Sequence, residues 1–405
     1  MPDRRILLAD ADAFFVGVAR MVDPDGAGKA RLLIVGGTRE SRGVVCSASY
    51  EARKFGVRSA MSIAHALRLC PDAMCVPVPS KACGVKSREI RAVLERYAPI
   101  VEGASVDEWY MDLAGTEGVY RHEPLRDTAH RMRTAVKNET GMSVSIGGGT
   151  NKLIAKLAVE RAKPKPGTVA DGVHIVPPGE EAPFVETFLL ADLPMVGPKF
   201  QEKLRSLGMT TVPDVKQHDL PTLRRWLGER TADWLWDRVH GVSESEVEGG
   251  GDAKSMSRDE TFPYDLRDDR DLERELLALV TRVVFDLRSD GLAARTVTVK
   301  LRDMDFRTRS ARRTLPEPVV SDRVVMGVAR ELLGRLRQSR RVPARLIGVA
   351  LSSLAEDPKA DQLALFERDD PLAETDRDRA LARTVDRVRE KFGAKGIVPA
   401  ALVEE

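Results

Sequence analysis

The sequence predicts an α+β protein made of several domains, and three regional patterns carry this prediction. Short apolar runs typical of strands alternate with amphipathic helical segments over residues 4–167, which is the pattern of sheets covered by helices. Residues 168–243 are helical and compact. Residues 255–355 follow the order strand, helix, strand, strand, helix, strand, which is the β-α-β-β-α-β, ferredoxin-like pattern.

The first of these regions opens with a buried strand within residues 4–15, which ends abruptly in acids and aromatic residues. A helix with one apolar stripe is predicted over 87–98. The other elements expected here are strands at 31–37 and 43–49, helices at 50–56, 61–70 and 123–141, and a strand, glycine turn and helix over 142–167.

The second region contains a tight turn, Pro194–Gly197, that joins two short helices. Three consecutive glycines at 249–251 mark a linker between the second and third regions, because glycines have no side chains to pack. In the third region Thr298, Lys300 and Arg302 alternate with apolar residues. Basic and hydroxyl groups therefore share one sheet face, which suits a nucleic-acid backbone.

Composition and charge limit the function classes. The 405 residues, enough for roughly two to four domains, are 42% apolar and 31% charged, with a net charge of +2. Residues 291–345 nevertheless hold 14 Arg and Lys against 5 Asp and Glu, an excess that suits a polyanionic partner better than a membrane. The alternative is an ordinary solvated surface, which charge alone does not exclude.

The chain shows no sign of a membrane or secretory protein. No apolar run approaches about 18 residues, and the first residues lack the apolar core of a signal peptide. The cysteines at 46, 70, 75 and 83 have neither zinc-site nor paired spacing, which predicts buried thiols in a reducing compartment. We therefore expect a cytoplasmic protein that does not bind membranes.

Three carboxylates are the strongest candidates for chemistry. Asp10 ends the first strand, and Asp107 and Glu108 lie where two strand-like runs meet with no residues to spare. That spacing predicts an antiparallel hairpin whose turn holds both acids, and a hairpin beside the first strand would bring all three together. Each acid alone is more often a turn residue or a helix cap. The three together, without His or Cys, favour Mg²⁺ and two-ion phosphoryl transfer.

Anion-binding side chains stand near these acids in the sequence. Tyr50, Arg53 and Lys54 share one helical face, and arginine and lysine are the usual phosphate ligands. Three lysines, at positions 152, 156 and 163, follow the glycines at 147–149. Those glycines do not have the spacing of a phosphate-binding P-loop, so they are only weak evidence for nucleotide binding.

With these residues assembled, the chain resembles the Y-family translesion DNA polymerases, and most closely the bacterial DNA polymerase IV (DinB-type) group. The likeness covers roughly residues 4–355 and runs in order through five blocks. The blocks are ILLADADAFFVGV, SYEARKFGVRSAM, SVDEWYMD, SIGGGTNKLIAKLAVERAKP and VKLRDMDFRTRS. Each block is moderately specific, and their order makes coincidence very improbable.

The resemblance implies a right-hand polymerase with a ferredoxin-like palm, small fingers, a helical thumb with a helix-hairpin-helix, and a β-α-β-β-α-β little finger. The implied boundaries are palm 1–12 and 77–167, fingers 13–76, thumb 168–243, linker 244–254, little finger 255–355 and tail 356–405. The implied enzyme is a monomer that adds dNTPs to a primer 3′-OH on template DNA, with low fidelity.

The resemblance also assigns residues to roles. Two Mg²⁺ ions, with Mn²⁺ as a possible substitute, would bind Asp10, Asp107, Glu108 and the carbonyl of Ala11. Phe15 occupies the steric-gate position, where a ring blocks a ribose 2′-OH, and Phe14 beside it is grouped with the nucleotide site although its chemistry suits the core. Implied triphosphate ligands are Ser47, Tyr50, Arg53 and Lys163; implied DNA contacts are Gly197, Lys199, Thr298, Lys300, Arg302, Arg307 and Arg309.

The acidic tail holds one apolar island, Gln362-Leu363-Ala364-Leu365-Phe366. It is similar to the peptide by which bacterial polymerases bind the sliding clamp. Gln362, Leu363, Leu365 and Phe366 would be its anchors in an apolar pocket of the clamp. The alternative is that the leucines and phenylalanine fold back on the little finger. A final helix is expected over 379–393.

Three positions depart from the usual pattern of this family. Ala11 replaces a larger residue, Gly148 and Gly149 replace bulkier ones, and Trp109 stands where a small side chain is usual. Two other functions compete with polymerase: a non-catalytic, polymerase-like DNA-binding accessory protein recruited to the clamp at lesions, and a helix-hairpin-helix repair nuclease. Retention of Asp10, Asp107 and Glu108 argues against the accessory protein.

Overall fold

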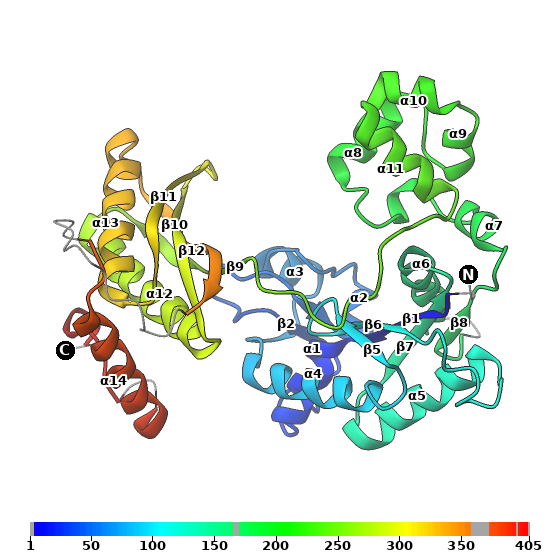
Figure 1. Cartoon of the computed structure of the whole chain (residues 1–405), viewed down its shortest axis with the longest axis horizontal. Coiled ribbons are helices and arrows are strands. Elements are labelled where there is room, and N and C mark those ends of the chain that lie inside the picture. The colour runs from blue at the N-terminus through cyan, green and yellow to red at the C-terminus, as the bar shows by residue number, and fades with distance from the viewer. Residues whose placement is uncertain (1–3, 165–169, 358–371, 394–395, 404–405) are drawn as a thin grey trace. The chain divides into compact units, whose positions relative to one another are not determined.

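The computed structural model describes residues 4–164, 170–357, 372–393 and 396–403. The chain divides into two compact units, Met1–Gly251 and Asp252–Glu405, whose elements are labelled in Figure 1. Among the described residues, no helix has the length and apolar character needed to cross a membrane.

A five-stranded sheet forms the centre of the first unit. Its order is β5 (Ile100–Gly103), β6 (Glu108–Asp112), β1 (Ile6–Ala11), β7 (Val144–Gly149) and β8 (Val173–Ile175). Neighbouring strands are antiparallel except β7 and β8. The predicted hairpin is thus confirmed as β5–β6, although Glu108 is already the first residue of β6. Since β8 extends this sheet, the palm boundary predicted at residue 167 is wrong by about one strand.

Helices cover both faces of the palm sheet. On one face, α4 (Ser80–Leu94) and α5 (Leu125–Thr140) enclose the main apolar core with α1 (Phe14–Val22). On the other face α6 (Lys152–Ala162) packs through Ala155 and Val159 on Ile6 and Leu8 of β1. Successive residues of β1 therefore alternate between two covered faces, and Asp10 lies on the α6 face.

The fingers and the thumb are smaller bodies attached to the palm. The fingers contain a three-stranded sheet, β3-β2-β4, formed by β2 (Leu33–Val35), β3 (Ser47–Ala48) and β4 (Met74–Val76), with the short helices α2 (Tyr50–Arg53) and α3 (Ile63–Leu69). The thumb consists of α7 (Glu181–Glu186), η1 (Leu190–Asp192), α8 (Pro198–Ser206), α9 (Val212–Lys216), α10 (Leu220–Leu227) and α11 (Glu229–Val239). Its core extends onto α6 through Leu153, Ile154 and Leu157.

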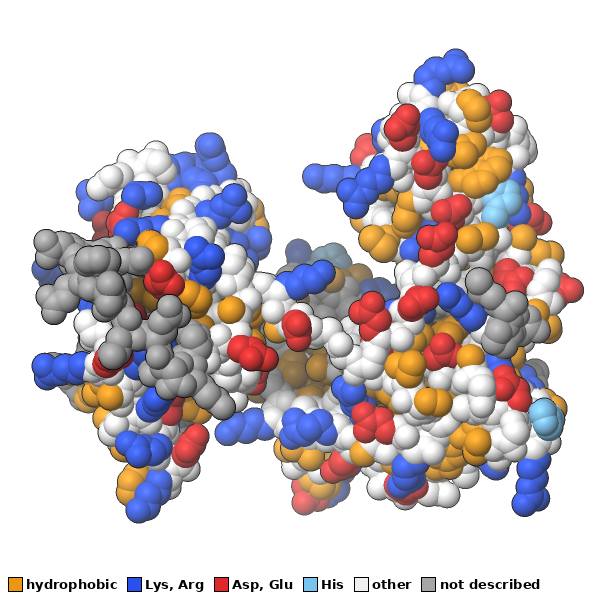
Figure 2. Space-filling model, viewed as in Figure 1, with side chains coloured by type: hydrophobic (Ala, Val, Ile, Leu, Met, Phe, Trp, Pro, Cys, Tyr) orange, Lys and Arg blue, Asp and Glu red, His pale blue; other side chains and the backbone are white. Residues whose placement is uncertain are grey.

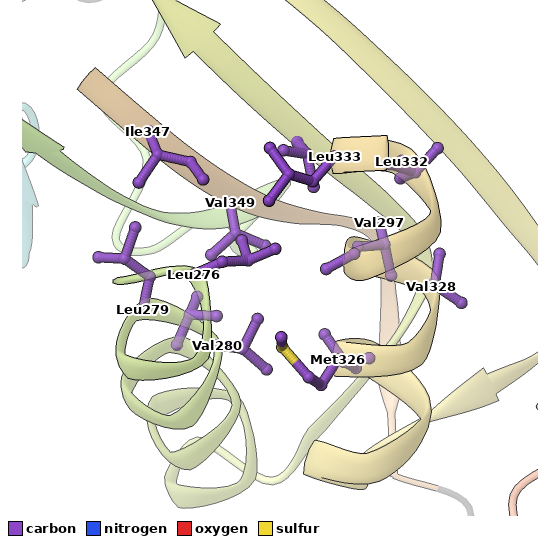
Figure 3. Close-up of a cluster of buried hydrophobic side chains, with 14 of the residues drawn as sticks. Leu276, Leu279, Val280, Val297, Met326, Val328, Leu332, Leu333, Ile347 and Val349 are labelled. Carbon is purple, nitrogen blue, oxygen red and sulfur yellow. The ribbon is translucent and has the colours of Figure 1, made fainter. Parts of the chain in front are cut away.

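The second unit confirms the predicted order of elements. It contains β9 (Ser255–Leu266), α12 (Asp269–Ser289), β10 (Leu292–Asp303), β11 (Thr308–Val319), α13 (Asp322–Ser339) and β12 (Ala344–Glu356). The sheet order is β11-β10-β12-β9, with all neighbours antiparallel. Figure 3 shows the core, in which Leu276 and Val280 of α12 meet Leu333 of α13 over Val297 and Val349 of the sheet. Both helices cover one face and leave the other open.

A C-terminal helix, α14 (Asp376–Phe392), is docked on this unit by ion pairs. The Arg288 side chain, 7% exposed, binds both carboxylate oxygens of Asp386 at 2.6 and 2.8 Å. Arg323 binds both oxygens of Asp378 at 2.7 and 2.8 Å. The final helix predicted from residue 379 is confirmed, and it begins three residues earlier because Thr375 and Asp378 form a capping box.

Candidate functional site

Two of the three candidate acids face each other across the palm sheet. Asp10 of β1 is directly opposite Glu108 of β6 in the antiparallel register, and directly opposed residues project from the same face of a sheet. The backbone N–H of Ala11 donates to the carbonyl of Asp107 at 2.9 Å. The end of β1 and the β5–β6 turn are therefore held side by side, as the sequence predicted.

Helix α6 supplies the cations that balance these acids. Lys163 Nζ lies 2.9 Å from Asp10 Oδ2, and Lys156 Nζ lies 2.5 Å from Glu108 Oε1 and 4.0 Å from Asp10 Oδ2. Lys156 lies within α6, and Lys163 is the C-cap residue directly after the helix; the two ion pairs show that both side chains reach the acids. Sequence reasoning grouped both lysines with the anion ligands but did not find their pairing with the acids.

Burial dominates the electrostatics of Asp10, which is 6% exposed. Burial raises the pKa of Asp10 to about 7, although the charge of Lys163 opposes this shift. For Lys163, burial alone would lower the pKa, but the charge of Asp10 and the hydrogen bond to Glu160 raise it overall. A carboxylate in this position needs a persistent positive partner to stay ionised at neutral pH.

Asp107 is placed differently from the other two acids. It lies in the β5–β6 turn, where its Oδ1 accepts a hydrogen bond from Ser105 Oγ at 2.5 Å. In the parts of the chain that the structure describes, no three His, Cys, Asp or Glu side chains gather closely enough to hold a metal ion. The donor set still suits a hard cation, because Asp10 and Glu108 already hold two ammonium groups through carboxylate oxygens.

The direction in which the Trp109 side chain points follows from the alternation of side chains between the two faces of the sheet. It follows Glu108 in β6 and so points to the opposite face, where it is 1% exposed within the core covered by α4 and α5. Its cross-strand neighbours are Ala9 and Gly103, which are small enough to leave room for an indole. The bulk of Trp109 therefore fills the core and leaves the carboxylate of Glu108 on the α6 side.

The fingers bring polar side chains to the same place. Burial raises the pKa of Tyr50, and the nearby charges of Asp12, Arg53, Lys163 and Asp10 also act on it. Its hydroxyl is therefore within electrostatic reach of the palm acids. Arg53 is braced by a 2.9 Å hydrogen bond to the carbonyl of Ala48 and a 3.5 Å one to Ser47 Oγ, and it stacks on the Tyr50 ring at 4.9 Å.

The two phenylalanines of α1 have different environments. Phe14 is 1% exposed in the palm core, so its place among the nucleotide-binding residues is corrected: no surface of the ring is left for a ligand. Phe15 is half-buried and contacts Phe14 edge to face at 5.5 Å. Helix α1 begins abruptly after Ala13, whose φ of 47° turns the chain away from β1.

The glycines at 147–149 serve packing. A Cβ on Gly147 would lie 2.1 Å from the backbone nitrogen of Val159 in α6, and one on Gly149 would lie 2.3 Å from Ile154. These glycines therefore let α6 lie directly on β7. Lys152 is also not free to bind an anion, because both oxygens of Glu102 hold its ammonium at 2.7 Å.

The open sheet face of the second unit carries most of the predicted basic residues. Thr298, Lys300 and Arg302 alternate with buried neighbours in β10, and Lys300 forms an ion pair with Asp259 of β9. Arg307 is exposed in the β10–β11 turn. Arg312, which sequence reasoning missed, joins this face because it is directly opposite Thr298. Lys and Arg side chains spread over the part of this unit around β10 and β11 in Figure 2.

Arg309 does not belong to this face, and its assignment as a DNA contact is wrong. It pairs with Leu301 in the register, so its side chain points to the helix-covered face. There it lies 2.9 Å from the carboxylate of Asp303, which is fully buried, and donates to the Leu336 carbonyl at the end of α13. Arg309 therefore has a structural role, because it pairs a buried charge and closes a helix end.

The predicted turn of the thumb is exposed. It lies between η1 and α8, and Gly197 is the N-cap of α8 with open space where a Cβ would be. Lys199 is exposed in the first turn of that helix, and blue side chains project from this part of the thumb in Figure 2. The clamp-peptide residues Gln362, Leu363, Leu365 and Phe366 lie outside the described residues.

Comparisons with known proteins agree with this architecture. Residues 9–160 match the impB/mucB/samB family, residues 253–365 match the C-terminal domain of that family, and residues 191–242 match the thumb domain of DNA polymerase iota. DNA polymerase IV of Dehalococcoides mccartyi strain CBDB1 is 34% identical over 397 residues, covering 98% of this chain and 97% of that protein. The enzyme of Halorhodospira halophila is 36% identical over 363 residues, covering 90% and 98%.

Solved structures give the same fold. A Y-family DNA polymerase chimera of Dbh and Dpo4 aligns with a TM-score of 0.74 at 24% identity, covering 86% of this chain and 98% of that one. An insertion ternary complex of Dbh DNA polymerase aligns over the same shares with a TM-score of 0.60. The polymerase fold predicted from the sequence is thereby confirmed.

Within that class, the chain belongs to the bacterial DNA polymerase IV, or DinB-type, family. It is a DNA-directed DNA polymerase of the translesion type, and members of the family depend on divalent metal ions. The non-catalytic accessory protein and the repair nuclease are thereby disfavoured.

Proposed function

We propose that this polymerase extends a primer 3′-OH on damaged templates by two-metal phosphoryl transfer, with Mg²⁺ as the metal, and that the sliding clamp recruits it as a monomer. The observation that carries the catalytic proposal is the pairing of Asp10 with Glu108 across β1 and β6, next to two lysines of α6. A phosphoryl-transfer site needs this combination of anionic metal ligands and phosphate-binding cations.

The acids and the Ala11 carbonyl would hold the metal. Bound divalent cations would lower the pKa of the primer 3′-OH and neutralise charge on the phosphates. Asp10 and Glu108 would supply oxygens from neighbouring strands, and Asp107 would do so from the turn, where its carboxylate now accepts a hydrogen bond from Ser105. Lys156 stays beside Glu108 and limits the repulsion between the carboxylates.

The incoming triphosphate would bind between the palm and the fingers. Arg53 is held in place by Ala48 and Ser47, so its guanidinium is oriented before a phosphate arrives. Lys163, which pairs with Asp10 at 2.9 Å, would hold a phosphate oxygen of the triphosphate. Phe15 of α1, which takes the steric-gate position by resemblance, would exclude a 2′-OH.

Primer-template DNA would contact two surfaces without reading sequence. Gly197 and Lys199 of the thumb turn can offer backbone N–H groups and a charge to phosphates, and Thr298, Lys300, Arg302, Arg307 and Arg312 do so from the open sheet of the second unit. Backbone contacts of this kind suit an enzyme that must accept distorted templates.

Clamp recruitment rests on the sequence of the tail and on what surrounds it. The described residues on either side of the peptide are anchored: Asp357 and Glu374 both pair with Arg379 of α14, at 2.8 and 2.7 Å. These two pairs fix the described chain on both sides of residues 358–371.

Asp107→Asn tests the catalytic proposal. It removes the charge and keeps the shape, so Mg²⁺-dependent primer extension should fall well beyond the ~10–100-fold typical of residues that only support metal ligands. Asp72→Asn, an exposed acid in the fingers, should extend normally. Full extension by Asp107→Asn would remove this residue from the metal-binding set, and no extension by the unaltered chain would sink the proposed chemistry.

Phe15→Ala tests the steric gate. Loss of the ring should raise incorporation of ribonucleotides relative to deoxyribonucleotides, measured on the same primer with each nucleotide alone. Phe14→Leu is the matched control, because its ring lies in the core; it should lower the melting temperature and leave sugar discrimination unchanged. Unaltered discrimination in Phe15→Ala would exclude this ring as the gate.

Arg312→Ala and Arg309→Ala separate DNA contact from structure. Arg312→Ala should weaken DNA binding, lower the slope of log K against log salt by about 1, and leave stability unchanged. Arg309→Ala should instead destabilise the protein by about 1–3 kcal/mol, because Asp303 loses one of its partners. Binding titrations at several salt concentrations and thermal melts distinguish the two, and an unchanged salt slope for Arg312→Ala counts against the sheet face.

Replacing Leu365 and Phe366 together by Ala tests clamp recruitment. Clamp-stimulated synthesis should disappear while synthesis without the clamp is retained, because the catalytic unit is untouched. The matched control replaces Leu381 and Phe392 by Ala, which are the same residue types, 61% and 66% exposed. If stimulation survives loss of Leu365 and Phe366, the peptide is not the clamp ligand.

A further inference from the structure

Three consecutive residues, Thr150, Asn151 and Lys152, each bind a different segment of the first unit. Thr150 and Asn151 lie between β7 and α6, and Lys152 is the first residue of α6. At this point the sequence shows only a weak resemblance to a phosphate loop. None of the three is used in the catalytic proposal. Their partners belong to the beginning of the thumb, the end of the thumb and the chain that follows the thumb.

Thr150 and Asn151 hold both ends of the thumb. Thr150 Oγ1 donates to Glu181 Oε1 at 2.7 Å, and Glu181 is the first residue of α7. Asn151 is 8% exposed, and its Nδ2 donates to the carbonyl of Gly241 at 2.8 Å, just after α11. The two held points touch each other, because a Cβ on Gly241 would lie 2.8 Å from Cβ of Glu181.

Lys152 holds the chain that leaves the thumb. Its ammonium is bound by both carboxylate oxygens of Glu102 in β5 and donates to the carbonyl of Glu246 at 3.1 Å. The same Glu102 accepts from the backbone N–H of Glu248 at 2.9 Å. Val247 between them is buried against β1 and α6. The segment 246–248, which belongs to the predicted linker 244–254, is therefore fixed on the palm sheet.

We propose that Thr150, Asn151 and Lys152 are positioning residues that set the thumb on the palm and so determine how tightly the enzyme holds primer-template DNA. The inference rests on the proposed contact of the thumb with DNA. A thumb held at both ends populates its DNA-binding position more fully, and a protein only fractionally in its competent state binds with an affinity reduced by that fraction.

Asn151→Asp isolates the contact with the thumb. Asn151 Oδ1 caps α6 by accepting from the N–H of Ile154 at 3.0 Å, and Asp is as good an N-cap as Asn. The helix that carries Lys156 and Lys163 therefore keeps its cap. Only the donor to Gly241 is lost, and the buried carbonyl is left facing a carboxylate. We expect the dissociation constant for primer-template DNA to rise about fivefold or more.

Thr150→Val is a second variant that adds no charge and should raise the same dissociation constant to a smaller extent. Asn138→Asp, the same chemical change at an exposed position of α5, is the matched control and should bind DNA like the unaltered enzyme. The single-turnover rate at saturating DNA and dNTP should be unchanged in all three, since the acids and their lysines are not touched.

Fluorescence anisotropy with labelled primer-template gives the dissociation constant for DNA. Rapid-quench single turnovers give the rate at saturating DNA and dNTP. DNA affinity equal to that of the unaltered enzyme in both Asn151→Asp and Thr150→Val would overturn the inference, as would a slower saturated turnover with unchanged affinity. Lys199→Ala is measured alongside: if it leaves DNA affinity unchanged, the proposed thumb contact fails. If Lys199→Ala weakens DNA binding but Asn151→Asp and Thr150→Val do not, the thumb contact stands and the positioning role fails.

Discussion

The close packing of α6 on the backbone of β7 is the constraint on which the rest of the first unit depends. It requires glycine at 147, because a side chain there would collide with backbone atoms of α6. With the helix held against the sheet, Lys156 and Lys163 reach the acids on β1 and β6, while Leu153 and Leu157 on another side become part of the thumb core. The position of α6 therefore fixes both the candidate acids and the thumb core relative to the same helix.

The charge balance of the site follows from that arrangement. Asp10 is almost completely buried beside a second carboxylate, a situation that favours protonation unless cations are supplied. The lysines of α6 supply them from the protein itself. In the proposed reaction, Asp10 and Glu108 would hold the metal and Lys163 would hold a phosphate, so that each charged side chain would keep a partner of opposite charge.

How much could be predicted depended on the range of the interactions involved. The first strand, the hairpin with the acids and the element order of residues 255–355 follow from local periodicity, and the sequence predicted them. The sequence did not predict which residues of β11 lie on the open face. Arg309 and Arg312 occupy opposite faces of this strand, and only the register with β10 decides which face is open. Asn151 and Gly241 are 90 residues apart, and no pattern in either segment points to the other. Strand β8, with three residues, is too short to show a period.

Helix α14 in the tail is held in position by ion pairs with the rest of the second unit. The sequence of α14 is mostly charged, and its charges are used: Asp378 and Asp386 bind arginines of α13 and α12, and Arg379 binds the acids that precede and follow residues 358–371. Partly buried pairs that use both carboxylate oxygens are more selective than exposed ones, because removal of one partner leaves a buried charge.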